Sequence, residues 1–325
     1  MRVLVAGGAG YIGSHVCKAL AEAGVEPVTL DNLSEGNRRA VKWGPLIVGD
    51  VADPRLAAAA IERTGAQAVI HLAGSAPGPD RPENPAACYR SNVAGTLSLI
   101  EAMHKTGLKA IVFSSTAAVY GHPRRLPIPE DCPAAPIDPF GRSKLMIEQI
   151  LADEAAAYNL RFVALRYFNA AGADPEGEIG DRRRAVTHFI AAALSVAAGE
   201  SARLAIEGLD HATADGSCVR DYIHVSDLAA GHLLALGHLR KGGASAVLNL
   251  GTGRGASMLE IVAGVERVTG RKLACLSRPR RLGDPPALVA DPSLANRLLG
   301  FAPKLSDVDS IVGTAWQFRQ RRQAA

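Results

Sequence analysis

Three regularly spaced glycines near the start of the chain are the first residues whose pattern predicts chemistry. Gly7, Gly10 and Gly13 follow the apolar run Arg2–Ala6 and open a helical pattern. This order of strand, tight turn and helix brings a dinucleotide pyrophosphate to a helix N-terminus. Gly7 permits the turn, Gly10 lets the backbone approach the phosphates, and Gly13 lets helix and strand pack closely. The segment therefore predicts a dinucleotide site.

An acidic residue stands where the second strand of such a unit ends. Asp31 follows the run Pro27–Leu30, about 20 residues after the glycines. A carboxylate at this position accepts hydrogen bonds from the adenosine ribose and repels a 2′-phosphate, which favours NAD over NADP. The alternative interpretation is a turn carboxylate in front of Asn32.

The elements that must position these residues alternate through the first half of the chain. Short β-branched runs predict strands, and Ala- and Leu-rich stretches between them predict helices. The expected strands are Arg2–Ala6, Pro27–Leu30, Leu46–Val48, Ala68–His71, Ala110–Phe113 and Arg161–Leu165. The expected helices are Ile12–Ala23, Pro54–Arg63, Pro85–Lys105 and Gly141–Tyr158. The alternation predicts an α/β fold, a doubly wound parallel Rossmann sheet covered by helices on both faces.

The pattern changes after Asn169, where loops rich in Gly and Pro separate shorter elements. These loops are Gly172–Gly180, Leu209–Ser217 and Arg278–Pro286. We therefore expect an NAD-binding domain over residues 1–170 and a smaller α/β lobe built mainly from residues 171–325. Some segments of the second half are expected to return to the first domain.

Composition argues against several other classes of protein. The 325 residues are 48% hydrophobic with a net charge of +4, which gives no reason to expect nucleic acid as a partner. The basic cluster Arg319, Arg321 and Arg322 is interpreted as a solvated helix end. The longest apolar run, Phe189–Ala198, predicts a short core helix, far below the roughly 18–20 residues of a membrane span.

The N-terminus and the cysteines bear on location and metal binding. Since the chain begins directly with a strand pattern, no signal peptide is expected. The five cysteines are scattered without a CxxC pair, and the nine histidines show no metal-ligand spacing. We expect reduced thiols, a cytoplasmic protein and no metal site.

Several ordered motifs give the chain a family resemblance. Gly7–His15 followed by Asp31–Leu33 resembles the opening of the UDP-glucose (UDP-galactose) 4-epimerases, members of the extended short-chain dehydrogenase/reductase family. Later motifs occur in the same order as in that family: Gly49–Val51, Ile70–Gly74, Asn92–Thr96, Phe113–Gly121, Arg166–Gly172, Asp215–Val225, Asn249–Gly253 and Arg280–Asp284. The resemblance extends almost to the C-terminus, and it implies a permanently held NAD and a UDP-sugar substrate.

The resemblance also implies a reaction, in which hydride leaves sugar C4, the 4-keto sugar turns, and hydride returns to the opposite face. In the family a Tyr-x-x-x-Lys helix works with a Ser or Thr on the preceding strand. Here Thr116 supplies that hydroxyl and would polarise the sugar O4, while Lys144 would hold the nicotinamide ribose. Phe140 occupies the position of the tyrosine that accepts the O4 proton.

Phe140 keeps the aromatic ring and lacks the acid/base group. One interpretation is simply a buried aromatic residue at a helix start. The other is a deleted general base, which costs about two to four orders of magnitude in rate, so we expect slow epimerisation or none. The change is either a deliberate one that traps the complex or a natural feature of a non-catalytic relative. The retained Thr116, Lys144 and Arg220 favour the first explanation.

The resemblance assigns site residues one by one. The implied cofactor-binding residues are Gly7, Gly10, Tyr11, Ile12, Gly13, Asp31, Asn32, Asp50, Val51, Leu72, Ala73, Gly74, Asn92, Ser114, Lys144 and Tyr167. The implied substrate-binding residues are Thr116, Phe140, Asn169, His188, Phe189, Arg220, Arg281 and Asp284. Arg220 and Arg281 would clamp the two phosphates, since guanidinium groups suit a diphosphate. Asp284 would bind the uridine ribose, with His188 and Phe189 along the uracil.

Departures from the family cluster around the sugar pocket. The family usually has a lysine shortly after Gly74, where this chain has Ser75–Pro79, and Leu288 has an intermediate size at the position that admits or excludes N-acetylated sugars. Arg182–Arg184 suggests either an acidic sugar or a solvated run. A neutral UDP-hexose is favoured.

Other functions and the assembly state stay open. The alternatives are an epimerase of a UDP-N-acetylhexosamine, uronate or pentose, and a non-catalytic NAD and nucleotide-sugar binding protein. By resemblance, a homodimer is expected through helices such as Pro85–Lys105 and Gly141–Tyr158.

Overall fold

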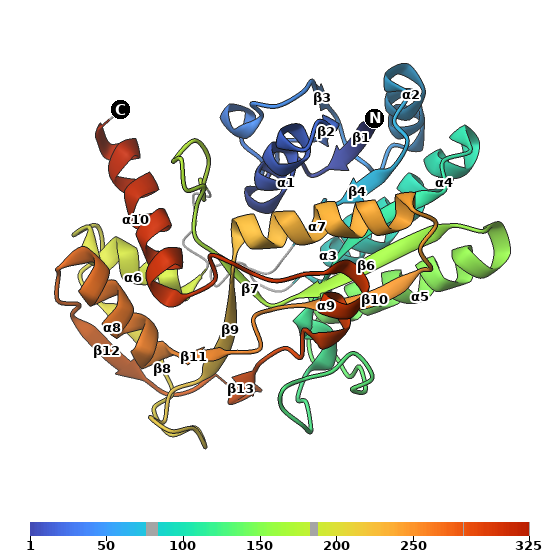
Figure 1. Cartoon of the computed structure of the whole chain (residues 1–325). Coiled ribbons are helices and arrows are strands. Elements are labelled where there is room, and N and C mark those ends of the chain that lie inside the picture. Colours follow the sequence, from blue (N-terminus) through green and yellow to red (C-terminus); the bar gives the residue numbers. More distant parts are fainter. Residues whose placement is uncertain (76–83, 183–187, 282, 325) are drawn as a thin grey trace.

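A parallel sheet of seven strands, in the order β10-β6-β5-β4-β1-β2-β3, is the frame of the molecule (Figure 1). Its strands are β1 (Arg2–Ala6), β2 (Glu26–Asp31), β3 (Leu46–Val48), β4 (Val69–His71), β5 (Ala110–Thr116), β6 (Arg161–Tyr167) and β10 (Ala246–Leu250). The computed structural model describes residues 1–75, 84–182, 188–281 and 283–324. The strand order reverses between β1 and β4, and ligands of such sheets bind at the carboxyl ends beside this switch point.

Helices cover both faces of this sheet, as the alternating pattern predicted (Figure 1). The helices concerned are α1 (Tyr11–Glu22), α2 (Pro54–Thr64), α4 (Gly95–Thr106), α5 (Pro139–Tyr158) and α7 (Val225–Arg240). Along β1, Val3 packs with α1 and α7 on one face, and Leu4 packs with α2, α4 and α5 on the other. Because side chains alternate along a strand, both faces of this central strand must be apolar.

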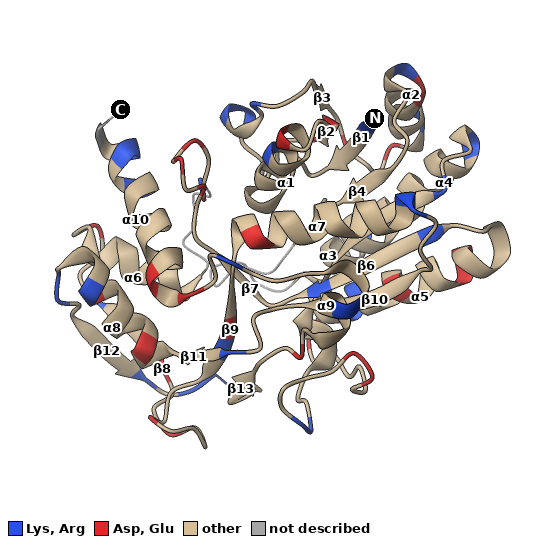
Figure 2. Ribbon diagram, viewed as in Figure 1, with Lys and Arg blue, Asp and Glu red and all other residues tan. Residues whose placement is uncertain are grey.

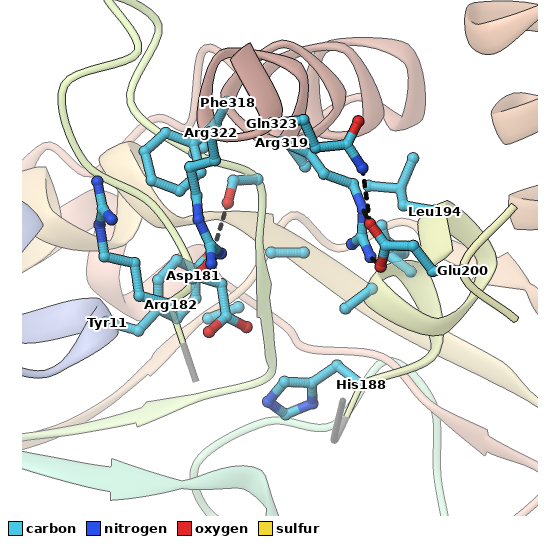
Figure 3. A pocket seen from close by; sticks show the side chains of 17 residues that line it. Tyr11, Asp181, Arg182, His188, Leu194, Glu200, Phe318, Arg319, Arg322 and Gln323 are labelled. Carbon is cyan, nitrogen blue, oxygen red and sulfur yellow. Dashed lines mark hydrogen bonds and ion pairs between the residues drawn. The ribbon is translucent and has the colours of Figure 1, made fainter. Parts of the chain in front are cut away.

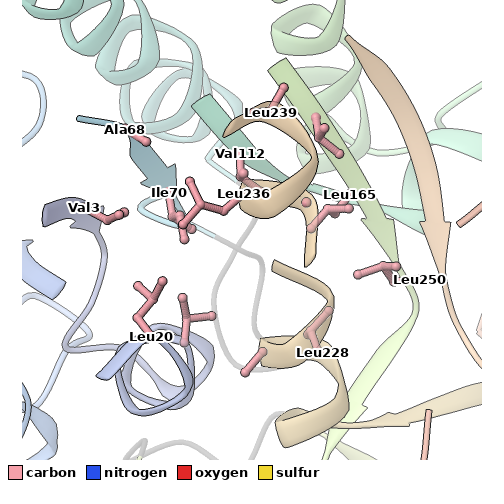
Figure 4. Close-up of a cluster of buried hydrophobic side chains, with 14 of the residues drawn as sticks. Val3, Leu20, Ala68, Ile70, Val112, Leu165, Leu228, Leu236, Leu239 and Leu250 are labelled. Atoms are coloured by element: carbon pink, nitrogen blue, oxygen red, sulfur yellow. The ribbon is translucent and has the colours of Figure 1, made fainter. Parts of the chain in front are cut away.

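Figure 4 shows the core between the sheet and the helices α1 and α7. Ile70, Val112 and Leu165 project from three neighbouring strands, and Leu20 of α1 and Leu236 of α7 pack over them. All five side chains are fully or almost fully buried. Burial of side chains of this size contributes about 1.5–3 kcal/mol each, so this core fixes α1 and α7 on the sheet.

The predicted helix Pro85–Lys105 is wrong as a single element. The structure has α3 (Pro85–Tyr89), a π-helical stretch (Arg90–Ala94) and then α4. The π-helical stretch turns Asn92 into the interior, where its side-chain nitrogen donates to Ser143 Oγ at 2.8 Å. Such wide turns in a helix often occur at functional sites, and an apolar periodicity does not predict them.

A smaller lobe is built from the second half of the chain. Its helices are α6 (Phe189–Ala197), α8 (Met258–Thr269) and α10 (Val308–Ala324). Strand β9 (Val219–His224) pairs with β7 (Asn169–Ala171), β11 (Gly255–Ser257) and β13 (Ala287–Leu288), and β8 (Leu204–Glu207) pairs with β12 (Cys275–Arg278). Helix α9 (Ser293–Leu299) and the 3-10 turns Arg38–Ala40 and Ala117–Tyr120 complete the elements that the structure describes. Since α7 and β10 pack in the first part, residues after 171 contribute to both.

Charged residues of both signs are spread over the described parts of the chain. Figure 2 shows Lys and Arg interspersed with Asp and Glu over the helices and loops of both parts. All five cysteines are free thiols. Among the described residues, no helix is both long enough and apolar enough to cross a bilayer.

A direct ion-pair contact joins α1 to the smaller lobe. Lys18 of α1 donates to Asp174 at 2.9 Å, to Glu176 at 2.7 Å and to Glu178 at 2.9 Å. The hydroxyl of Tyr11, also in α1, donates a hydrogen bond to Gly172 O at 2.7 Å. The loop that follows β7 is therefore held against the first helix.

Gly13 gives a test of the close packing between α1 and the turn that follows β1. A Cβ at Gly13 would overlap the carbonyl oxygen of Gly7, whereas a Cβ at Gly237 of α7 meets nothing within 4 Å. Gly13→Ala is expected to lower the free energy of unfolding by about 1–3 kcal/mol through overpacking. Gly237→Ala should instead raise it by about 0.5–1 kcal/mol, because alanine favours a helix. Urea unfolding of both variants measures these changes, and equal effects would contradict the packing described here.

Candidate active site

A groove with a volume of about 540 Å³ opens at the carboxyl ends of β1, β2 and β4. Nine of the predicted cofactor residues line it: Gly7, Gly10, Asp31, Asn32, Asp50, Val51, Leu72, Ala73 and Gly74. Residues from four separate segments of the sequence meet here because the strands that precede them are neighbours in the sheet. This is the position where parallel sheets of this order bind ligands.

The glycine turn shapes one end of the groove. Gly7 has a φ of +86°, and a Cβ there would lie 2.6 Å from the backbone nitrogen of Ala73. Gly10 is the N-cap residue of α1, and no side chain caps the first turn of that helix. The N–H groups at a helix start favour an anion, and here they open toward the groove beside Gly10. The arrangement fits a pyrophosphate.

Asp31 is held firmly at the other end of the same groove. Its two carboxylate oxygens accept hydrogen bonds from Ala9 N at 3.0 Å and Leu33 N at 2.8 Å. Burial raises the pKa of Asp31, and the two backbone hydrogen bonds oppose that rise. Beside it, Asn32 donates to Asp50 Oδ2 at 2.8 Å. This end of the groove offers acceptors to a ribose and repels additional negative charge.

Lys144 lies at the buried junction of β5 and α5. Its Nζ donates to Ser114 O at 2.9 Å, 4.8 Å from the ring centre of Phe113 and 5.8 Å from that of Phe140. Burial lowers the pKa of Lys144 from 10.5 to about 8, and the effects of Cys88 and Glu148 oppose this in part. The structure therefore brings position 140 and the lysine together, as the spacing on one helix face predicted.

Thr116 and Tyr167 end the two neighbouring strands β5 and β6. They are register partners in the parallel pair, and the hydroxyls of Tyr167 and Ser114 share a hydrogen bond of 2.6 Å. Thr116 Oγ1 accepts from Ala118 N at 3.2 Å, which begins the 3-10 turn after the strand. Ser114, Thr116, Tyr167 and Lys144 thus gather at one place on the sheet edge.

Asn92 connects this cluster to the groove. Its Oδ1 accepts from Ser75 N at 2.7 Å, and its Nδ2 donates to Ser75 O at 3.1 Å as well as to Ser143. A Cβ added at Gly74, which lines the groove, would lie 2.9 Å from Asn92 Oδ1 and 3.6 Å from Lys144 Nζ. The groove and the lysine are therefore neighbours.

A buried ionic network between β5, β6 and α5 adjoins the cluster around Lys144. The sequence analysis did not predict this network. Arg166 donates to both carboxylate oxygens of Glu148, Nη2 to Oε2 at 2.6 Å, and Ser115 Oγ donates to Glu148 at 2.5 Å. Arg166 also donates to the hydroxyl of Tyr120, which donates to Asn249 at 2.7 Å. Burial lowers the pKa of Arg166, but the hydrogen bonds to Glu148 outweigh that effect and raise it. A charged residue inside an apolar strand was the available signal.

The two arginines of the predicted phosphate clamp form separate ion pairs in the structure. Arg220 of β9 is mostly buried and pairs with Asp284 at 2.9 Å. Arg281 lies on a loop and pairs with Glu207, a residue that the sequence analysis did not single out. Asn169 is the first residue of β7, which runs beside β9. Arg220, Asp284 and Asn169 thus belong to one region, while Arg281 is more exposed.

Five further predicted residues lie outside the groove and the Lys144 cluster. Tyr11 and His188 line a second cavity, of about 370 Å³, together with residues of α6 and α10 (Figure 3). Ile12 packs against the core under α1 and α7, and Phe189 packs against two apolar clusters of the lobe. Gly13 is buried below the turn that it allows. Of the departures around the sugar pocket, residues 76–79 lie outside the described residues, as do Arg183 and Arg184.

Comparison with known proteins gives matches over nearly the whole chain. The family model described as the NAD dependent epimerase/dehydratase family matches residues 3–251. A UDP-glucose 4-epimerase of Azospirillum brasilense is 49% identical over 315 residues, which cover 97% of this chain and 90% of that protein.

Two solved structures have nearly the same fold as this chain over almost its whole length. The UDP-glucose 4-epimerase from Brucella ovis in complex with NAD has a TM-score of 0.95 at 50% identity, covering 97% of each chain. The enzyme from Stenotrophomonas maltophila, with bound NAD and formylated UDP-arabinopyranose, has a TM-score of 0.96 at 37% identity and covers 100% of both chains.

The buried ammonium of Lys144 should make stability depend on pH. Below pH 8, Lys144 is protonated in both states, and the folded state is destabilised by the buried charge. Between pH 8 and 10.5, Lys144 is neutral in the folded state and protonated in the unfolded state, so raising the pH favours folding. The stability of the parent protein relative to Lys144→Met should therefore rise across that window, by at most about 3 kcal/mol. Urea unfolding of the NAD-free proteins at a series of pH values measures the difference. Exposed Lys105→Met is the control, and a flat difference for Lys144→Met would refute the buried charge.

Proposed function

We infer that the chain, which belongs to the UDP-glucose 4-epimerase family within the NAD dependent epimerase/dehydratase family, carries out the NAD-dependent UDP-sugar 4-epimerisation of that group. From this membership we propose that it interconverts UDP-glucose and UDP-galactose, at a rate limited by Phe140. One observation supports the proposal most strongly: the ammonium of Lys144 lies 5.8 Å from the ring of Phe140, beside a groove that fits a dinucleotide.

NAD fits the groove on the evidence of the residues that form it. The start of α1 has no capping side chain, and its N-cap residue Gly10 has no Cβ to block the approach of a pyrophosphate. Asp31 presents a fixed carboxylate for the adenosine ribose, and its charge disfavours the 2′-phosphate of NADP. When bound, NAD supplies reversible acceptance of hydride from the sugar carbon.

The residues at the ends of β5 and α5 would handle the sugar O4. We propose that the hydroxyl of Thr116 donates to O4 as this atom gains carbonyl character. Lys144 would hold the nicotinamide ribose with its ammonium group, whose position Ser114 O fixes at 2.9 Å. At residue 140 a phenyl ring offers no acceptor for the O4 proton, and loss of such a base costs about 10²–10⁴ in rate. The residues present therefore bind and orient well and transfer the proton poorly.

The nucleotide end is proposed to use the two arginines of the lobe. Arg220 and Arg281 would contact the diphosphate, for which planar guanidinium groups provide paired donors. Their carboxylate partners Asp284 and Glu207 restrict the positions of both guanidinium groups. Asp284 would contact the uridine ribose, and Asn169 of β7 would contact the diphosphate or uracil side. A neutral hexose remains the favoured sugar, and a UDP-N-acetylhexosamine, uronate or pentose the alternative.

The proposed assembly is a homodimer. Leu97 of α4 and Met146 of α5 expose 41% and 42% of their surface. Both helices pack on the same face of the sheet, opposite α1 and α7. Apolar side chains on neighbouring helices suit an interface between two copies. The proposed location is the cytoplasm, where the five free thiols would stay reduced.

A second candidate function is binding of NAD and a nucleotide sugar without catalysis. Phe140 is the observation that favours it, since the groove and the lobe arginines are retained while the proton acceptor is absent. The two candidate functions predict different results for Phe140→Tyr, which restores a hydroxyl at residue 140: an epimerase gains activity, and a binding protein does not.

Phe140→Tyr is expected to raise kcat for conversion of UDP-galactose to UDP-glucose by about 10²–10⁴, because it restores the general base beside Lys144. Phe140→Leu is the matched control and should gain nothing, while NAD content and UDP binding stay the same in all three proteins. A coupled assay for UDP-glucose measures the rate. The parent protein should also show little NADH absorbance when UDP-galactose is added. If the tyrosine variant binds UDP-galactose and leaves it unchanged, a screen of other UDP-sugars separates a different substrate from a non-catalytic role.

Asp31→Ala is expected to weaken NAD binding by about tenfold to a hundredfold, the usual effect of losing hydrogen bonds to a charged acceptor. Binding of NADP should change little or improve, since the repulsion of the 2′-phosphate disappears. Glu26→Ala, an exposed residue at the start of the same strand, is the control. Calorimetric titration of the cofactor-free proteins with both dinucleotides measures the ratio. An unchanged ratio would exclude Asp31 from the ribose site.

A further inference from the structure

The second cavity lies between the smaller lobe and the start of α1 (Figure 3). Its walls are the strand and loop residues 170–173, the apolar face of α6 around Leu194, and the last turns of α10 with Phe318. The volume of about 370 Å³ is within the range of small-molecule sites. None of the residues proposed to clamp the diphosphate lines it.

On one side of this cavity, the positive charge of Arg319 is balanced by the carboxylate of Glu200. Arg319 pairs with Glu200, and it also donates to Ser195 Oγ at 2.8 Å. Gln323 donates to the same carboxylate at 2.8 Å. The arginine cation lowers the pKa of Glu200 and keeps it ionised. The expectation that Arg319 belongs to a solvated helix end is therefore wrong, because its guanidinium joins α10 to the end of α6.

The other side holds Arg182 and Arg322, and the carboxyl group of Asp181 is also part of the lining. Among the described residues, no carboxylate forms an ion pair with Arg182 or Arg322. Arg322 donates to the backbone oxygen of Asp181, at 3.3 Å. The guanidinium of Arg182 lies 5.3 Å from the ring centre of Phe318, and its buried Nε has no hydrogen-bond partner in the part of the chain that the structure describes. Figure 3 shows both arginines on the same side of the cavity.

The local field gives a reason for an anion to enter. Burial lowers the pKa of Arg182, and the neighbouring cations Arg322 and Arg39 lower it further. An oxyanion placed between Arg182 and Arg322 would remove this repulsion and satisfy a buried donor. Guanidinium groups bind phosphate through paired, charge-assisted hydrogen bonds, so phosphate chemistry suits this pair better than a neutral ligand does.

We propose that Arg182 and Arg322 form a binding site for a small oxyanion, inorganic phosphate or a phosphomonoester, separate from the diphosphate clamp. The apolar side of the cavity, formed by Leu194, Ala315 and Phe318, would accept the organic part of a monoester. Tyr11 connects this site to the active site, since its hydroxyl donates to Gly172 O, three residues after Asn169. An occupant would therefore contact the end of β7 and the loop that follows it.

The test is calorimetric titration of the NAD-loaded protein with inorganic phosphate, in the absence and presence of saturating UDP. Arg182→Ala and Arg322→Ala should each weaken phosphate binding about tenfold, the effect of losing one charge-assisted hydrogen bond of about 1.4 kcal/mol. Arg321→Ala is the matched control, because Arg321 lies on the same helix and contacts Glu176 O outside the cavity. Arg322→Lys should keep more of the binding than Arg322→Ala, and melting curves show whether each variant is folded.

UDP and Arg220→Ala separate this site from the proposed nucleotide site. Phosphate binding that persists in both, and that falls in the two cavity variants, supports the proposal. In the opposite outcome, phosphate binding disappears with UDP or with Arg220→Ala and stays unchanged in Arg322→Ala. That result assigns the phosphate to the diphosphate clamp and overturns the proposal. Equal losses in Arg321→Ala and Arg322→Ala, or no measurable binding, overturn it as well. A phenyl phosphate that binds more tightly than phosphate identifies the monoester as the preferred ligand.

Discussion

The attachment of Lys144 to the backbone of β5 is the contact on which the geometry of the site depends. An ammonium group that is almost fully buried must have a fixed acceptor, and Ser114 O at 2.9 Å provides it. This bond sets the position of α5 on the strand, and therefore the position of residue 140 one turn earlier. The ion pair of Glu148 and Arg166 joins the same helix to the next strand, β6, so buried charged groups fix α5 against two neighbouring strands.

The sequence predicted the features that depend on local chemistry. The glycine spacing after β1 and the carboxylate at the end of β2 were sufficient to identify the dinucleotide groove, because each residue acts within its own turn. Apart from the helix Pro85–Lys105, the predicted strands and helices of the first half were confirmed to within a few residues. The π-helical stretch at Arg90–Ala94 was missed, since it follows from the contacts of Asn92 with two distant segments.

Pairings between distant residues account for the rest of what the sequence did not predict. Glu148 and Arg166 are 18 residues apart, and Glu207 meets Arg281 only after β8 and β12 have formed a pair. No periodicity in either segment specifies such a partner. The interpretation of Arg182 as part of a solvated run had the same weakness, because the ring of Phe318 and the cation of Arg322 come from the last helix. Charge in a sequence indicates a surface only when no distant segment folds over it.

The contact of Lys18 with three carboxylates has a consequence for how the two parts of the molecule respond to each other. The same helix offers its first turn to the dinucleotide and its second to the loop after β7. A ligand that steadies α1 thereby also steadies the lobe, and a lobe closed on its substrate disfavours escape of the dinucleotide. The expected retention of NAD for many turnovers would then follow from thermodynamic linkage between two binding events, without any need for a covalent bond.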